Sequence, residues 1–235
     1  MSSADAAQPW AGKTGEFFSG WAESGRGERM AQGHARLVEV CLEKLALDAE
    51  SRLLDVGCGV GRALERARAL AEGAALAGVD VASAMIEEAR TLLPEAELQV
   101  ASADALPFPD EAFSHLLSVE AIYYFEDPPA AFRELRRVLA PGARVALALE
   151  LFEENHGSAA WRDALEIPVH LLSSEAWSEH LRAAGFVDVC AERIHCHDDK
   201  EWSGPSPYFP SRELFEAYVE AGALLLLART PSAGA

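Results

Sequence analysis

The stretch LLDVGCGVGR at positions 53–62 constrains the fold of this chain more than any other part of the sequence. A short apolar run that contains Asp55 leads into three glycines at alternate positions, Gly57, Gly59 and Gly61, and then into a helix-forming segment. This order predicts a buried strand that turns tightly into a helix. Because glycine has no Cβ, such a turn can adopt positive φ angles and lets a ligand approach the backbone closely.

Two residues narrow the kind of ligand that this turn suits. A dinucleotide-binding turn carries the spacing G-x-G-x-x-G and places a pyrophosphate at the helix N-terminus. Here the sixth position is Arg62, and the third glycine comes one residue early. The carboxylate of Asp55 at the strand end would repel a phosphate, whereas it suits a ligand whose nearby end carries an ammonium group.

Length and charge limit the class of protein. A chain of 235 residues is long enough for one domain with a substantial core. With 38 acidic and 20 basic side chains, the formal charge of -18 disfavours nucleic acids and anionic membrane surfaces as partners. We find no signal peptide and no run near the ~20 apolar residues of a membrane helix, so we expect a cytoplasmic protein without membrane insertion.

Strands and helices alternate along the chain. After the glycine turn, apolar runs predict strands at 75–81, 98–102, 112–119, 143–151, 186–194 and 223–228. Helical spacing and cap residues predict helices at 34–45, 63–71, 84–93, with Ser83 as N-cap, 129–139, 173–184 and 212–220. This alternation predicts a Rossmann-like, doubly wound α/β fold whose mostly parallel sheet has helices on both faces.

Four acidic residues fall where predicted strands end: Asp55, Asp80, Asp104 and Glu120. Ligands of such sheets bind at the carboxyl ends of the strands, so these side chains should meet at one site. Asp80 lies 19 residues beyond Gly61, close to the ~20 expected for an acid that binds a ribose hydroxyl pair. The sequence therefore predicts a nucleoside-binding site at this edge.

Three motifs together resemble the class I S-adenosylmethionine-dependent methyltransferases. They are DVGCGVG at 55–61, ADALPFPD at 103–110 and FRELRRVLAPG at 132–142. The segment 119–124 is similar to the branch that acts on quinones, sterols and other small natural products. The resemblance covers residues 50–150 firmly and the last strands loosely. It implies a seven-stranded sheet with an antiparallel last strand at its edge, and S-adenosyl-L-methionine as cofactor.

The resemblance also implies roles for individual residues. The glycines would line the methionine part of the cofactor, Asp55 would hold its amino group and Asp80 its ribose. Asp104 and Ala105 would meet the adenine. The complete set of implied cofactor-binding residues is Asp55, Gly57, Cys58, Gly59, Gly61, Asp80, Val81, Met85, Asp104, Ala105, Val119 and Glu120.

Candidate catalytic residues are Tyr123, Tyr124 and His34. In the related branch a histidine often follows the fourth strand, and tyrosines hold those places here. A tyrosine with its ordinary pKa near 10 is a poor base at neutral pH, so the two rings would shape the pocket or stabilise a cationic methyl group. His34 precedes the helix beside the glycine turn and is the third candidate.

We expect no metal site. The cysteines form no C-x-x-C pair. The run His195-Cys196-His197-Asp198-Asp199 contains residue types that bind metals, but adjacent positions on a strand point to opposite faces.

These observations predict a single domain. Residues 1–45 would form an N-terminal helical cover, 46–151 the cofactor-binding core, and 152–235 the acceptor side and the last strands. The predicted function is methyl transfer to oxygen, nitrogen or carbon of a small organic acceptor. Two alternatives stay open: a nicotinamide-dependent oxidoreductase, which Asp55 and the missing sixth glycine oppose, and a non-catalytic cofactor-binding module.

Overall fold

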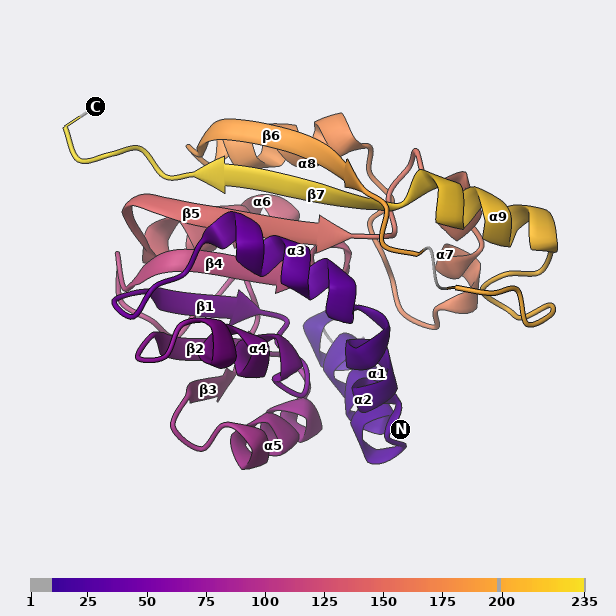
Figure 1. The fold of residues 1–235 in the computed structure, drawn as a ribbon, viewed down its shortest axis with the longest axis horizontal. Helices are drawn as coiled ribbons and strands as arrows, with labels where there is room; N and C mark the ends of the chain where they lie inside the picture. The colour runs from indigo at the N-terminus through magenta and orange to yellow at the C-terminus, as the bar shows by residue number, and fades with distance from the viewer. Residues whose placement is uncertain (1–9, 198–199, 235) are drawn as a thin grey trace, which may run out of the picture.

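The computed structural model describes residues 10–197 and 200–234. Its strands form one seven-stranded sheet in the order β3-β2-β1-β4-β5-β7-β6 (Figure 1). The strands are β1 (Arg52–Val56), β2 (Ala75–Asp80), β3 (Glu97–Val100), β4 (Phe113–Val119), β5 (Leu139–Leu149), β6 (Val187–Ile194) and β7 (Ala223–Arg229). The α-helices are α1 (Trp10–Glu23), α2 (Arg26–Gly33), α3 (Ala35–Leu45), α4 (Arg62–Leu70), α5 (Ser83–Leu92), α6 (Pro128–Val138), α7 (Trp161–Ala164), α8 (Ser174–Ala183) and α9 (Arg212–Ala221).

The sheet confirms the Rossmann-like fold and the antiparallel last strand. Strands β3, β2, β1, β4 and β5 pair in parallel, and β7 pairs antiparallel with both β5 and β6. The prediction that β7 forms the sheet edge is wrong, because β6 takes that place. The continuous apolar run of β7 is almost entirely buried, whereas most residues of β6 are exposed or half-buried. The apolar strand β7 therefore lies inside the sheet, and β6, which carries both polar and apolar residues, forms the edge.

Two apolar clusters hold helices on the two faces of the sheet. Leu53 points into a cluster with residues of α3, α4 and α5, including Leu37, Leu64 and Ile86. Its neighbour Leu54 points to the other face, where α6 and α8 contribute residues such as Phe132, Leu135 and Trp177. Successive strand residues thus serve opposite faces, as the strand geometry requires. No helix among the described residues is long and apolar enough to cross a membrane.

The N-terminal helices lie across the carboxyl ends of the central strands. Figure 1 shows α1 and α2 beyond the arrowhead of β1, with α7 and α9 on the same side of the sheet. Helix α1 contacts α5, and its Gly15 sits directly against the backbone of Val81 just after β2. A Cβ on Gly15 would come within 2.6 Å of the Val81 carbonyl oxygen. This close approach seats α1 over the sheet edge where the predicted site lies.

Candidate functional site

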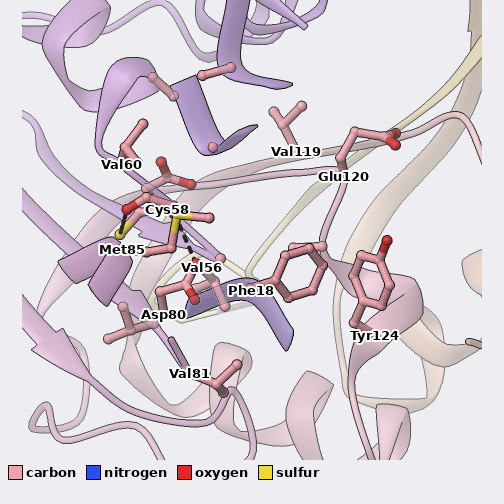
Figure 2. A pocket seen from close by; sticks show the side chains of 18 of the residues that line it. Phe18, Val56, Cys58, Val60, Asp80, Val81, Met85, Val119, Glu120 and Tyr124 are labelled. Atoms are coloured by element: carbon pink, nitrogen blue, oxygen red, sulfur yellow. Dashed lines mark hydrogen bonds between the residues drawn. The ribbon is translucent and has the colours of Figure 1, made fainter. Parts of the chain in front are cut away.

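A cavity opens at the carboxyl edge of β1, β2 and β4, beneath α1, α2 and the start of α3 (Figure 2). It holds about 1260 Å³ of space, its open mouth included. Residues of the glycine turn, of the strand ends and of the N-terminal helices line this one space. The predicted site residues that line it are His34, Asp55, Gly57, Cys58, Gly59, Asp80, Val81, Met85, Val119, Glu120 and Tyr124.

Four predicted residues do not line this cavity. They are Gly61, Asp104, Ala105 and Tyr123, although Ala103 beside Asp104 does line it. Gly61 instead starts α4 with φ of 86°, and its Cα packs against Ala89 of α5. The adenine contact of Asp104 and Ala105 stays a prediction.

The glycine turn has one crowded and one open position. Gly57 has φ of 78°, and a Cβ there would lie 2.3 Å from the Cβ of Ala121. Gly59 has φ of 51°, and a Cβ there would meet no atom within 4 Å. Gly57 is therefore required by packing between β1 and the segment after β4. Gly59 leaves open space at its backbone that a ligand can occupy.

Asp80 joins the end of β2 to the glycine turn. One carboxylate oxygen accepts the backbone N–H of Gly59 and the other that of Ala82, each at 2.9 Å. Burial raises the pKa of Asp80, and these backbone N–H groups act against that rise. The prediction that Ser83 caps α5 is wrong: Ala82 takes the cap position, and its N–H is satisfied by Asp80.

Asp55 lies at the end of β1, where it is almost fully buried. Burial, with a smaller effect from the charge of Asp80, raises the pKa of Asp55 to about 8. A cationic group beside this carboxyl would favour its ionised form and offset the cost of burial. The buried carboxyl of Asp55 therefore suits the ammonium end of an amino acid as its partner.

The second and third sequence motifs contact each other. Arg137 on α6 donates to the backbone carbonyls of Leu106 and Phe108 and pairs with Asp110 and Glu134. Glu134 in turn accepts the backbone N–H of Leu106 at 3.0 Å. Helix α6 thus fixes the loop after β3, which supplies Ala101, Ser102 and Ala103 to the cavity.

Thr14 is a cavity residue that the sequence reasoning missed. It lies on α1 next to Gly15, it is buried, and its Oγ1 has no hydrogen-bond partner within the described part of the chain. A buried hydroxyl without a partner is costly, so a bound polar group at this point would satisfy it. No local motif marks Thr14, because only the packing of α1 on the sheet brings it here.

Aromatic side chains line the cavity opposite Asp80. The ring of Phe18 on α1 meets that of Tyr124 edge-on at 5.0 Å between centroids (Figure 2). Tyr123 is buried behind Tyr124, and its hydroxyl donates to Glu120 at 2.7 Å. Burial raises the pKa of both tyrosines above their ordinary value, so neither serves as a base at neutral pH.

Contacts with α9 and with the N-terminal helices position parts of the segments 152–172 and 200–211. Gly157 packs so tightly on α9 that a Cβ would lie 2.1 Å from the backbone nitrogen of Tyr218. Arg26 on α2 lies over the ring of Trp21 and donates to the hydroxyl of Tyr208 at 2.8 Å. The N-terminal helices and the C-terminal loop are therefore in direct contact.

A buried polar group, which we call the Glu150 cluster, lies where these segments meet the end of β5. Tyr218 donates to one carboxylate oxygen of Glu150 at 2.6 Å, and His197 Nε2 lies 3.0 Å from the other. His34 Nε2 and Lys200 Nζ each lie 3.7 Å from the same carboxylate. The cluster comprises His34, Glu120, Glu150, His197, Lys200 and Tyr218.

The two glutamates of the cluster differ in charge. Burial opposes ionisation of Glu150, but His197, His34 and Lys200 outweigh it and lower its pKa to about 2. Burial and the charge of Glu150 raise the pKa of Glu120 to about 8. At neutral pH Glu150 is therefore an ion, and Glu120 is a neutral carboxyl.

Metal-ligand atom types gather in this cluster as well. The ligand atoms that His34, Glu120 and Glu150 offer lie within 4.8 Å of one another, and so do those that Glu150, Cys196 and His197 offer. We assign no metal here, because the Lys200 ammonium already gives the Glu150 carboxylate a cationic partner. Asp198 and Asp199, part of the run considered in the sequence, lie outside the described residues.

Comparison with known proteins defines the class. Residues 54–147 match a family described as a methyltransferase domain. The O-methyltransferase resE of Aspergillus sclerotiorum is 30% identical over 71% of this chain and 66% of its own length. A chain from the complex of the Haloferax volcanii Trm112 methyltransferase activator with the putative methyltransferase superposes with a TM-score of 0.83. It is 29% identical and covers 91% of this chain and 97% of that chain.

A second similar structure is the [4+2]-cyclase SpnF, with a TM-score of 0.65, 26% identity and coverage of 86% of this chain and 82% of that chain. The fold, the cavity and the family match together define a Rossmann-like enzyme with a cavity at the carboxyl edge of its sheet. The chain belongs to the class I S-adenosylmethionine-dependent methyltransferases. This confirms the class, the fold and the cofactor, S-adenosyl-L-methionine, that the motifs predicted.

Proposed function

We propose that this protein transfers a methyl group from S-adenosyl-L-methionine to a small organic acceptor bound in the same cavity. One observation carries the proposal: a single cavity joins the nucleoside-type wall around Asp80 to an aromatic and polar wall around Phe18, Tyr124 and His34. The first wall suits the cofactor and the second suits an acceptor with an apolar body.

In this proposal the cofactor follows the sheet edge. Asp80 binds the ribose hydroxyls, Val81 and Met85 flank the adenine, and the buried Asp55 pairs with the ammonium group. The open backbone at Gly59 accommodates the methionine part, and Asp104 with Ala105 contacts the adenine amino group. Thr14 gains its missing hydrogen bond from the bound nucleoside.

When bound, S-adenosyl-L-methionine supplies a methyl group that is already activated on a sulfonium. The work left to the protein is to align the acceptor with that methyl group and to exclude water. Helices α1 and α2 cover the cavity from above, and Phe18 and Tyr124 present ring surfaces that favour positive charge. These elements are the positioning machinery in our proposal.

The rival functions differ from this one in testable ways. A nicotinamide-dependent oxidoreductase would need a phosphate beside Asp55, and a phosphate, unlike an ammonium group, would not stabilise the ionised form of this buried carboxyl. SpnF is a named cyclase on this fold, so the fold by itself does not establish methyl transfer. The formal charge of -18 and the covered cavity favour a small molecule over a nucleic acid as acceptor.

The test is turnover with labelled cofactor. Protein would be incubated with methyl-labelled S-adenosylmethionine and a panel of aromatic alcohols, amines and enols, with S-adenosylhomocysteine and labelled product measured together. We expect product in step with S-adenosylhomocysteine for at least one class, and slower turnover at limiting cofactor concentration with an Asp80→Ala variant. Chemical conversion of a panel member without transfer of label would contradict methyl transfer and favour another reaction on this fold.

A further inference from the structure

His34 occupies a fixed position on the acceptor side of the cavity. It stands between α2 and α3, at the cap of α3, and its side chain is 13% exposed. Leu37, Val38 and Cys41 of α3 are buried against the sheet, so the start of this helix is held next to the ends of β4 and β5. Among the described residues that line the cavity, His34 is the only histidine.

Glu150 is held as a carboxylate by groups from separate segments. It follows β5, is 1% exposed, and meets Tyr218 from α9 and His197 from the preceding loop. Its own backbone is fixed too, since its N–H donates to Glu120 and its carbonyl accepts from Asn155. A buried carboxylate with this many donors stays ionised and keeps one orientation.

The side chains of His34 and Glu150 lie close enough for the charge of the carboxylate to act on the imidazole ring. His34 Nε2 lies 3.7 Å from a carboxylate oxygen of Glu150. A carboxylate at this position favours the tautomer with the proton on Nε2, which leaves the lone pair on Nδ1. Burial lowers the pKa of His34, Glu150 acts against that shift, and the charges of Lys200 and His197 lower the pKa further, so the imidazole is neutral at pH 7. A neutral imidazole can accept a proton, and the carboxylate then stabilises the imidazolium.

The two tyrosines and Glu120 beside His34 cannot take this role. Tyr123 and Tyr124 keep their protons at neutral pH, as does Glu120. His197 is 2% exposed, stacks on Tyr218 at 4.6 Å and does not line the cavity. Lys200 donates to Tyr218 and faces Glu150, and Cys196 is partly buried beside His197.

Resting on the function proposed above, we propose that His34 is the general base of an O-methylation and that Glu150 is its positioning residue. The acceptor is then a hydroxyl compound, such as a phenol or enol with an apolar body. The acceptor oxygen forms a bond to the methyl carbon while the carbon–sulfur bond breaks. The electron pair of that bond goes to sulfur, and the hydroxyl proton goes to Nδ1 of His34. The sum is one methyl ether, S-adenosylhomocysteine and one proton, with no oxidant or reductant needed.

One test needs no acceptor. In protein labelled with ¹⁵N-histidine and saturated with S-adenosylhomocysteine, NMR would report the charge and tautomer of His34, assigned through a His34→Asn variant. We expect a neutral Nε2–H ring at pH 7. Glu150→Gln should lower its pKa further, because the carboxylate that raises it is gone. Glu153→Gln, at an exposed position nearby, is the control and should leave it unchanged. A charged ring at pH 7, or a titration that Glu150→Gln does not move, would overturn the pair.

A second test separates base catalysis from binding. The probes are 2-naphthol, which needs a base, and 2-naphthalenethiol, which is already ionised at pH 8. We expect His34→Asn to slow methylation of the naphthol by about 100-fold or more while the thiol changes by less than roughly 3-fold. In Glu150→Gln the acid limb of the naphthol pH profile should move to lower pH. Equal losses on both probes would overturn the base assignment.

Cofactor affinity distinguishes the remaining outcomes. We expect both variants to bind S-adenosylhomocysteine within roughly 3-fold of wild type. A large loss of S-adenosylhomocysteine binding in His34→Asn would indicate that His34 contacts the cofactor, and would contradict its role as base. Failure of the wild type to methylate either probe would count against the proposed acceptor, while the NMR titration would still decide whether His34 and Glu150 form the pair.

Discussion

The carboxylate of Asp80 accepts the backbone N–H of Gly59 at 2.9 Å and so ties the end of β2 to the turn after β1. The same carboxylate accepts the N–H of Ala82 at the start of α5. Asp80 therefore organises two loops of the cavity before any ligand binds. A ribose at this site would share the remaining lone pairs of an acceptor that is already fixed in place.

Replacing Asp80 should weaken cofactor binding more than it weakens the fold. Loss of charge-assisted hydrogen bonds costs about 1.5–3 kcal/mol, so Asp80→Ala should lower affinity for S-adenosylhomocysteine by roughly 10- to 150-fold. Calorimetric titration would measure this, with circular dichroism to establish folding. Asp163→Asn, at an exposed position on α7, is the control. Unchanged affinity in a folded Asp80→Ala variant would contradict the ribose assignment.

Two glycines of the turn should respond differently to alanine. At Gly57 the new Cβ would collide with Ala121 and φ is 78°, so Gly57→Ala should destabilise the protein by about 2–4 kcal/mol. At Gly59 the space is open, so Gly59→Ala should destabilise the protein only by the strain of the left-handed backbone, about 1–2 kcal/mol. Urea unfolding of both variants would measure the difference. Equal stability of the two would show that the contact between Gly57 and Ala121 is not tight.

Two glycines of α1, Gly12 and Gly15, test whether this helix forms part of the cofactor site. Gly12 has open space around it, so Gly12→Ala should stabilise the helix by about 0.5–1 kcal/mol. Gly15→Ala would push α1 away from Val81 and should weaken binding of S-adenosylhomocysteine by roughly 10-fold, or about 1.4 kcal/mol. The measurement is affinity and unfolding free energy for each. Tighter or equal binding in Gly15→Ala would argue against α1 as part of the cofactor site.

The pH dependence of stability should report the burial of Asp55. Its pKa is about 8 in the folded protein against an ordinary 3.8, so the unfolded chain loses this proton at lower pH than the folded one. The contribution of Asp55 to the free energy of unfolding is fully present below pH 4 and is lost as the pH rises toward 8. Without ligand, the free energy of unfolding should fall over this range, and less steeply in Asp55→Asn. Asp80 and Glu120, whose pKa values are also raised, make the free energy of unfolding fall with pH in the same direction. The difference between wild type and Asp55→Asn therefore isolates the effect of Asp55.

Ligand binding should show the reverse trend. The ammonium group of S-adenosylhomocysteine stabilises the ionised Asp55, so affinity should rise from pH 6 to pH 8 with release of a proton. Titrations in two buffers with different ionisation enthalpies would count that proton. The Asp55→Asn variant should release fewer protons than wild type, and an identical count would contradict the pairing.

The cavity wall around the glycine turn and Asp80 was predictable because its sequence signals are local. Gly57, Gly59 and Asp80 lie in short patterns whose meaning follows from backbone geometry and from the carboxyl edge of a parallel sheet. The interlock of Arg137 with the loop at 106–110 likewise joins two motifs that were each recognisable in the sequence.

The Glu150 cluster was not predictable from the sequence, because segments far apart in the chain build it. Glu150 and Tyr218 are 68 residues apart, and no spacing rule links them to His34. The residues of 152–172 carry no clear period, and their position depends on contacts with α9 such as that of Gly157. The edge position of β6 was missed for a related reason, since strand order depends on which strand can be buried on both faces.

The most direct test of this account is calorimetric titration of the folded protein with S-adenosylhomocysteine, beside NADH as control. We predict tight, one-to-one binding of S-adenosylhomocysteine and no binding of NADH. Binding of NADH, or of neither ligand, would contradict the placement of S-adenosylmethionine at Asp55 and Asp80 and remove the basis for methyl transfer at this site.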